Sequence, residues 1–511
     1  MNTPHKAHST VSVWPLWCAA WIAAGCDTSI DYDARPGLNW ALSTFTGSAL
    51  FILFLRSGGK SLSWQRLLPL GFACAISAGA ALTTNGGLDA LIIIGVGGSL
   101  AAGLLLGSDA LAPQSLGAAA LLLSPATAAF RTLQEAGSRV REVTRRYREG
   151  RNLAAVRGVA LALPITLGLA LLLSHAEPVM ASWRDEIMQA LAEFSYLGRL
   201  TFFFTAGAFG LGYLGQALRP AAGPTLAGRW NEGTRERLVE TERLIVLTAV
   251  VSLFALFFLL QLSHLFGTAA GARGTGVTYA QTAHEGFAEL TLAASLSVAL
   301  TVTLLRSAGA IGLATREKWL SVVLTVQSQI LLLSALYRLD RYEEVYGYTE
   351  LRLLVQCYEV CVFVALGLLA LELLWGPDVR RLARRCAVTG LSALIVLLYW
   401  NYPAWIAHAN LARYARSGRL DVRYLVQGLG GDAVPELTRA LPALPASLQL
   451  RLRLCLQAHY ATRHVPPFVQ TAWYEWRYRQ RQMEQALARA GLAPSVQAIA
   501  PPVPKLDPCV Q

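Results

Sequence analysis

The chain has 511 residues, of which 54% are hydrophobic and only 15% charged, and its mean hydropathy is +0.42. Soluble domains carry about 25% charged residues, so this composition excludes a soluble globular protein for most of the chain. The net charge of +12 could indicate a nucleic-acid partner. Long apolar runs favour basic cytoplasmic loops instead, so we expect membrane lipids as partners and no nucleic acid.

Eleven apolar segments, most of them long enough to cross about 30 Å of hydrocarbon as helices, follow one another along the chain. They cover residues 14–27, 38–55, 67–84, 88–107, 155–174, 199–217, 243–264, 288–305, 319–337, 352–375 and 386–406. The sequence therefore predicts an all-α fold, a polytopic transmembrane helix bundle over residues 1–406. We expect an extramembrane helical tail over 407–491 and a disordered, proline-rich end over 492–511.

A twelfth candidate, 111–130, is weakly hydrophobic and contains Pro113 and Pro125. It would bring the count to twelve if it crossed the membrane, but the prolines and the alanine-rich run favour a re-entrant or surface-lying helix.

The distribution of basic residues supports eleven crossings. With a cytoplasmic N-terminus, the inward loops hold 22 lysine and arginine residues, whereas the outward loops hold 5. Lys and Arg in short loops are retained in the cytoplasm, so the pattern predicts a bacterial inner-membrane protein with an extracytoplasmic tail. A twelfth crossing would destroy this asymmetry.

The eight cysteines lie mostly inside apolar runs, and their spacing predicts neither a disulfide framework nor a zinc site. Ala23-Ala24-Gly25-Cys26 has the letters of a lipoprotein cleavage site, with Cys26 as the acylated residue. A small-residue turn at the end of a first span gives the same letters, and both interpretations place Asp27 outside.

Several sequence blocks, taken together, are typical of one family. They are Pro36-Gly37-Leu38-Asn39, Leu172 to Pro178, Tyr279 to Leu290, Tyr346-Gly347-Tyr348-Thr349-Glu350-Leu351-Arg352, and Asp432-Ala433-Val434-Pro435-Glu436-Leu437. From about residue 36 to 440 the chain resembles the bacterial polytopic membrane proteins known as domain of unknown function 4173, with their relative 4153. The resemblance implies a membrane bundle and no particular activity. His175, Glu177 and the pair His284-Glu285 depart from the family pattern.

Ionisable and amide side chains at membrane depth are the candidate functional residues, because they are costly there. Glu289 and Glu359 are the best placed, with Gln327 in a neighbouring span. They could form a proton or cation relay or could simply hydrogen-bond between helices. Arg352, in the Tyr346–Arg352 block, is a further candidate.

His284, Glu285 and Glu289 stand where a loop enters a helix, and they could converge on a metal. Their spacing is not that of a zincin, and a helix cap with Glu285 in the first turn explains them as well. The sequence therefore predicts no catalytic motif, no cofactor and no assigned metal site.

The basic segment 131–152 alternates arginine with glutamate, which suits anionic lipid or a solvated topological anchor. In the tail, Asp432 is expected to cap the helix that contains Leu437. Trp473 to Arg481 mixes aromatic residues with arginines, which suits a membrane interface or a helix-packing partner.

Two functions remain open at this stage. One is a non-catalytic membrane scaffold or sensor, and the other is a transporter of a small solute or ion that uses the intramembrane carboxylates. A membrane enzyme acting on lipid-linked substrates is a distant third.

Overall fold

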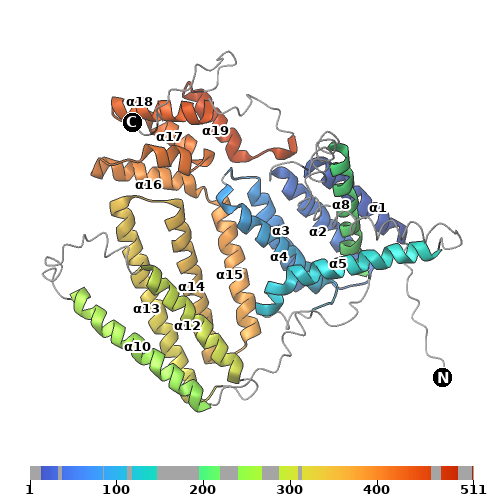
Figure 1. The fold of residues 1–511 in the computed structure, drawn as a ribbon, viewed down its shortest axis with the longest axis horizontal. Coiled ribbons are helices and arrows are strands. Elements are labelled where there is room, and N and C mark those ends of the chain that lie inside the picture. Colours follow the sequence, from blue (N-terminus) through green and yellow to red (C-terminus); the bar gives the residue numbers. More distant parts are fainter. Residues whose placement is uncertain are drawn as a thin grey trace, which may run out of the picture. The chain divides into compact units, whose positions relative to one another are not determined.

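The computed structural model describes residues 13–32, 37–84, 86–111, 118–146, 195–218, 240–266, 287–308, 313–461, 473–492 and 509. Within these ranges every regular element is a helix, so the predicted all-α class is confirmed (Figure 1). Two compact units can be distinguished and are described separately. One comprises Met1–Cys74, Ser99–Leu111 and Ser124–Thr225, and the other comprises Ala75–Gly98, Ala112–Leu123 and Leu226–Gln511.

Five helical segments among the described residues are long and apolar enough to cross a membrane. They are Leu38–Ser57 (α2), Gly86–Gly107 (which ends with α4, Asp89–Gly107), Thr315–Tyr346 (α13), Glu350–Trp375 (α14) and Val379–Tyr399 (α15). The chain is therefore a membrane protein, while the predicted total of eleven spans is not confirmed. The predicted span 155–174 lies outside the described residues.

The first unit is built around α1 (Val13–Ile30), α2 and α8 (Ser195–Leu218). Helix α8 packs along both α1 and α2. The close approach depends on small residues: a Cβ on Gly207 would stand 2.4 Å from the Trp21 ring, which also contacts Phe203 at a centroid distance of 5.2 Å. Helices within a membrane do not associate through the hydrophobic effect, because the lipid is as apolar as their side chains. They commonly pack through small residues that let their backbones approach closely.

One helix, α5 (Ala118–Arg146), contains residues 118–130 of the doubtful segment and residues 131–146 of the basic segment, and Pro125 lies within it. It does not qualify as a candidate span. The α5 residue Thr132 accepts a hydrogen bond from Gln216 Nε2 at 3.1 Å, and a Cβ on Gly212 would meet the Thr132 carbonyl. Helix α5 therefore crosses the C-terminal part of α8, which supports a surface-lying helix; that assignment stays a prediction.

The second unit contains a helical bundle that includes the candidate spans α13, α14 and α15. α12 (Phe287–Ala308), α13 and α14 pack on one another, and α15 packs against α14. α10 (Glu240–Phe266) lies against α13. Ala294, Leu332 and Leu366 form a buried core between three of these helices.

The last predicted span was misplaced. We expected residues 386–406, but α15 begins at Val379 and ends at Tyr399, and α16 (Tyr402–Ser417) begins after a break at Trp400 and Asn401. The Asp378 side chain accepts from the backbone N–H groups of Arg380 and Arg381, so the helix starts among charged residues that a hydropathy window excludes.

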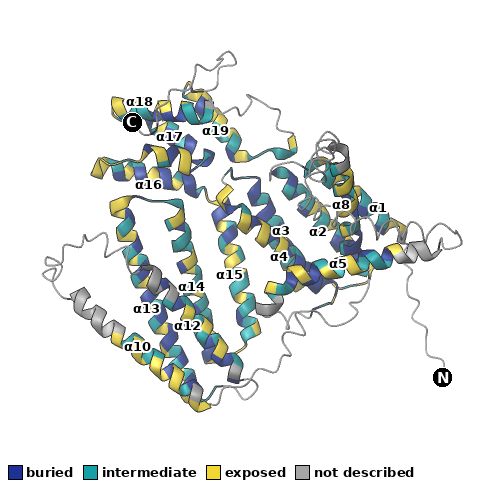
Figure 2. Cartoon of the chain, viewed as in Figure 1, coloured by how far each residue is buried: buried dark blue, intermediate teal, exposed yellow. Residues whose placement is uncertain are grey.

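The tail is a small helical assembly with its own core (Figure 2). Its helices are α16, α17 (Val434–Ala440), α18 (Ala446–Leu456) and α19 (Tyr478–Arg489). Val426, Leu429 and Leu437 are fully buried within it. Figure 1 shows this assembly at one end of α13, α14 and α15.

A disulfide joins Cys455 in α18 to Cys509, with a Cα–Cα distance of 4.9 Å. The sequence spacing did not predict it. Cys509 is the one described residue beyond Leu492, and Arg451 Nη2 donates to its carbonyl at 3.1 Å. The rest of the predicted disordered end lies outside the described residues.

Candidate functional site

A buried polar cluster of the second unit joins the tail to the turn between α3 (Trp64–Ala80) and α4. At its centre is Asp432, which is only 1% exposed. Oδ2 accepts from Thr83 Oγ1 at 2.8 Å and pairs with Arg479 Nη1 at 3.1 Å. Oδ1 accepts from the Thr84 backbone N–H at 2.9 Å and from the Thr84 hydroxyl. We call Asp432, Thr83, Thr84 and Arg479 the Asp432 node.

Arg479 extends the node to the end of a membrane helix. Its Nη2 donates to the carbonyl oxygens of Leu398 and Tyr399, the last turn of α15, at 3.2 and 3.1 Å. The backbone of α19 adds two hydrogen bonds, from the N–H groups of Tyr478 and Arg479 to the carbonyls of Ala81 and Leu82. Burying two charged side chains costs free energy because they lose their contacts with water. The hydrogen bonds to Asp432 and Arg479 offset this cost.

One sequence expectation for this region was wrong. Asp432 does not cap α17, because the N-cap is Ala433 and no side chain caps it. Arg479 belongs to the segment for which a membrane interface and a helix-packing partner were both open, and its side chain is buried in the node. No sequence signal pairs Thr83 with Asp432, since about 350 residues separate them.

A second polar cluster holds α16 against the turn between α13 and α14. Asn410 accepts from the Tyr348 N–H at 3.0 Å and donates to the Tyr348 carbonyl at 2.8 Å, so its amide binds both backbone groups of one residue. A Cβ on Gly347, where φ is +92°, would stand 2.7 Å from Asn410 Oδ1, so both conformation and space require glycine.

Glu350, at the start of α14, binds two tyrosines that follow the last span. Tyr402 Oη donates to Glu350 Oε1 at 2.8 Å, and the Glu350 N–H donates to Tyr424 Oη at 2.7 Å. Burial, and then the Glu350 carboxylate beside it, raise the pKa of Tyr402, so its hydroxyl stays a donor. The tail is thus fixed to the ends of α14 and α15 and to the α3–α4 turn.

Glu359 is the one predicted intramembrane carboxylate whose side chain is described. It is fully buried in α14, and its Oε1 accepts from Thr291 Oγ1 at 2.5 Å. Among the described residues its Oε2 has no hydrogen-bond partner, and the same holds for Gln327 Oε1. Gln327 Nε2 donates to the Val251 carbonyl, so Gln327 lies against a different helix from the one that pairs with Glu359.

The other predicted site residues are not brought together within the described part of the chain. Glu289 is in α12, but its side chain is not described, and His284 and Glu285 lie outside the described residues. Arg352 donates to the Gly347 carbonyl, and its guanidinium lies 4.5 Å from the centre of the Tyr342 ring. Arg352 therefore braces the α13–α14 turn. No group of three possible metal ligands was found among the residues the structure describes.

Ion pairs with buried carboxylates also lie at the ends of the bundle helices away from the tail. Glu317 accepts from Arg243 Nε at 2.8 Å, and Glu372 accepts from Arg381 Nε and Arg385 Nη1, both at 2.8 Å. In the first unit, Arg139 of the basic segment pairs with Glu135 at 2.7 Å. Arg139 is therefore engaged within the protein, and anionic lipid at 131–152 stays a prediction.

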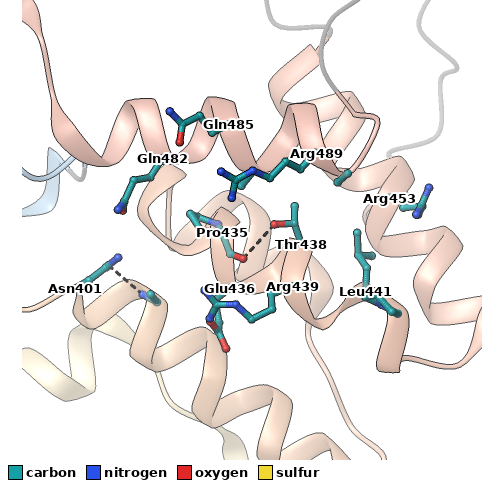
Figure 3. A pocket seen from close by; sticks show the side chains of 14 residues that line it. Asn401, Pro435, Glu436, Thr438, Arg439, Leu441, Arg453, Gln482, Gln485 and Arg489 are labelled. Carbon is teal, nitrogen blue, oxygen red and sulfur yellow. Dashed lines mark hydrogen bonds and ion pairs between the residues drawn. The ribbon is translucent and has the colours of Figure 1, made fainter.

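A cavity of about 660 Å³ opens between the tail helices (Figure 3). Asn401 and Ala404 line it beside the end of α15, and its other polar residues are Glu436, Thr438, Arg439, Arg453, Gln482, Gln485 and Arg489. Glu436 Oε1 lies 2.9 Å from His408 Nδ1, and the Glu436 carboxylate also pairs with Arg439. Sequence inspection did not find this cavity, because its lining comes from four segments of the tail.

These features define a helical membrane protein whose C-terminal helices are tied by buried polar contacts to the ends of its candidate membrane helices. A family model for a domain of unknown function, DUF4153, matches residues 70–440. Because the match covers more than half of the chain, the protein belongs to the DUF4153 family. The expected relationship is confirmed at this level, whereas membership of the related family 4173 is not shown. No curated protein and no solved structure matches the chain.

Proposed function

We propose that this protein is a non-catalytic membrane scaffold or sensor in which the tail is mechanically coupled to the membrane helices. The Asp432 node carries the proposal. A single buried carboxylate binds the α3–α4 turn through Thr83 and Thr84 and binds α19 through Arg479, which in turn holds the last carbonyls of α15. A displacement of α19 therefore acts directly on the ends of two membrane segments.

We further propose that the tail is extracytoplasmic and that the membrane is the bacterial inner membrane. Disulfides persist in oxidising compartments, so the Cys455–Cys509 bond supports a tail outside the cytoplasm. Arg243, Arg381 and Arg385 lie at the ends of the bundle helices away from the tail. Because arginines near the ends of spans are retained in the cytoplasm, these residues support a cytoplasmic location for those ends.

The coupling can be measured by hydrogen exchange of the full chain in nanodiscs. We expect Arg479→Gln to accelerate exchange at the amides of residues 478 and 479 and also in the last turn of α15, since the side chain that joins α19 to Asp432 and to the Leu398 and Tyr399 carbonyls is shortened. Arg481→Gln, on the same helix but exposed, is the matched control. Unchanged exchange in α15 when α19 has loosened would contradict the coupling.

A transporter of a small solute or ion is the second candidate, and one observation favours it. A fully buried carboxyl group with an unpartnered oxygen, as at Glu359, is the kind of site that could bind a proton or cation. The scaffold interpretation expects Glu359→Gln to fold normally and to change no flux in proteoliposomes. If the wild type shows flux and a fully stable Glu359→Gln protein does not, the protein is a transporter instead.

A further inference from the structure

We infer that the tail cavity is a binding site for a phosphate group, presented at the level of the membrane headgroups. The inference deepens the proposed sensor role, because it names the class of ligand that the tail would detect. It stands on the charge of the cavity, on the free arginines that line it and on its position next to the end of a membrane helix.

The cavity lining has a surplus of positive charge. Three arginines, Arg439, Arg453 and Arg489, line it against one glutamate, Glu436. The single carboxylate is already occupied by Arg439 and His408. Arg453 and Arg489 are exposed and form no ion pair among the described residues, so two guanidinium groups remain available for a ligand. Guanidinium groups bind phosphate oxygens in a bidentate way, which makes a phosphate the best-matched anion.

The remaining lining suits a polar group attached to the phosphate. Gln482 and Gln485 project from the same helix as Arg489, and Figure 3 shows them on the opposite side of the cavity from Glu436 and Arg439. Amide side chains can both donate to and accept from hydroxyl groups. The volume of about 660 Å³ lies within the range of small-molecule sites.

The position of the cavity fixes its depth relative to the membrane. Asn401 lies two residues beyond Tyr399, the last residue of the candidate span α15. Tyr399, Trp400 and Trp405 around this junction are all partly exposed, and aromatic residues of this kind mark the interface between hydrocarbon and water. A phosphate in the cavity would therefore lie where phospholipid headgroups lie, although a soluble phosphorylated solute could also enter from the water side.

The test uses the full chain in a neutral detergent and measures binding of three probes by thermal shift and calorimetry. The probes are inorganic phosphate, glycerol phosphate, and phosphatidylglycerol doped into the micelles. We expect saturable binding of at least one phosphate probe and none of diacylglycerol, which lacks the phosphate. Binding of the doped lipid alone would identify a headgroup site, and equal binding of glycerol phosphate would identify a soluble ligand.

The arginine assignment is tested by the double variant Arg453→Gln/Arg489→Gln. Because neither side chain has an ion-pair partner among the described residues, we expect its melting temperature without ligand to be unchanged and its affinity to fall about tenfold or more. Arg489→Lys keeps the charge but loses the planar fork, so an intermediate loss is expected. Arg481→Gln, outside the cavity lining, controls for the loss of one positive charge and is compared with Arg489→Gln alone as well as with the double variant. Wild-type protein that binds no phosphate probe, or a double variant that binds as tightly as Arg481→Gln, would overturn the inference. Neither result bears on the flux and exchange measurements that test the scaffold itself.

Discussion

Removing the carboxylate of Asp432 should detach α19 from the membrane helices. Asp432→Ala leaves the Arg479 guanidinium buried without its counter-charge and deprives Thr83 and Thr84 of their acceptor. Breaking a buried ion pair from one side costs about 3–5 kcal/mol. Asp432→Asn keeps an acceptor and the shape but not the charge, so a loss of about 1–3 kcal/mol is expected.

The free energy of local opening at α19, obtained from hydrogen exchange of the full chain, is the quantity to measure. Glu484→Ala provides a matched control, because Glu484 is an exposed carboxylate on the same helix, where substitutions usually change stability by less than about 0.5 kcal/mol. In a double-mutant cycle, the double variant Asp432→Ala/Arg479→Met should lose less opening free energy than the sum of the losses of the two single variants, because no unpaired charge remains. Opening energies for Asp432→Ala within about 0.5 kcal/mol of the control would refute the structural role of the node.

Three further predictions concern the disulfide, a titrating carboxyl group and the topology. Cys455→Ser should lower the stability of the tail by about 2–4 kcal/mol, and a reductant should lower the melting temperature of the wild type but not of the variant. Burial raises the pKa of Asp31 above 3.8, despite the hydrogen bond from Ser43, so ionisation opposes folding. The stability that the neutral form of Asp31 contributes is fully present below pH 3.8 and is lost as the pH rises through the raised pKa of the folded state. Asp31→Asn should remove this part of the dependence of stability on pH. Parallel pH profiles for the wild type and the variant would exclude Asp31 as the source. Cysteine labelling in intact cells should find residue 430 outside and residue 145 inside, and the reverse pattern would invert the proposed topology.

Much of the fold could be predicted from hydropathy, because long apolar runs have few alternatives to helices in a membrane. Helix ends were harder. The end of α15 was placed too late, since Pro403 and Ile406 continue the apolar pattern although Asn401 starts a new helix. The beginning was also placed too late, because the first turns carry arginines that reach Glu372.

The candidate site was largely beyond sequence reasoning. Glu359 could be selected because a carboxylate in an apolar run is conspicuous. Asp432 was noticed only as a helix cap, since its partners are set by tertiary packing between distant segments. Arg479 resembled its exposed neighbours in composition and gave no sign of burial. The cavity arises from the packing of four short tail segments, which one-dimensional patterns do not encode.

The Cys455–Cys509 bond closes a covalent ring that includes α19 and the Arg479 side chain buried against Asp432. A protease that cuts once between these cysteines would therefore release no fragment, and both pieces would remain linked through sulfur. The chain beyond α18 is thus held by the disulfide at one point and by the ion pair and backbone hydrogen bonds of α19 at another. Reduction alone would leave the contacts of α19, and loss of the ion pair alone would leave the ring, so neither change by itself frees this part of the chain.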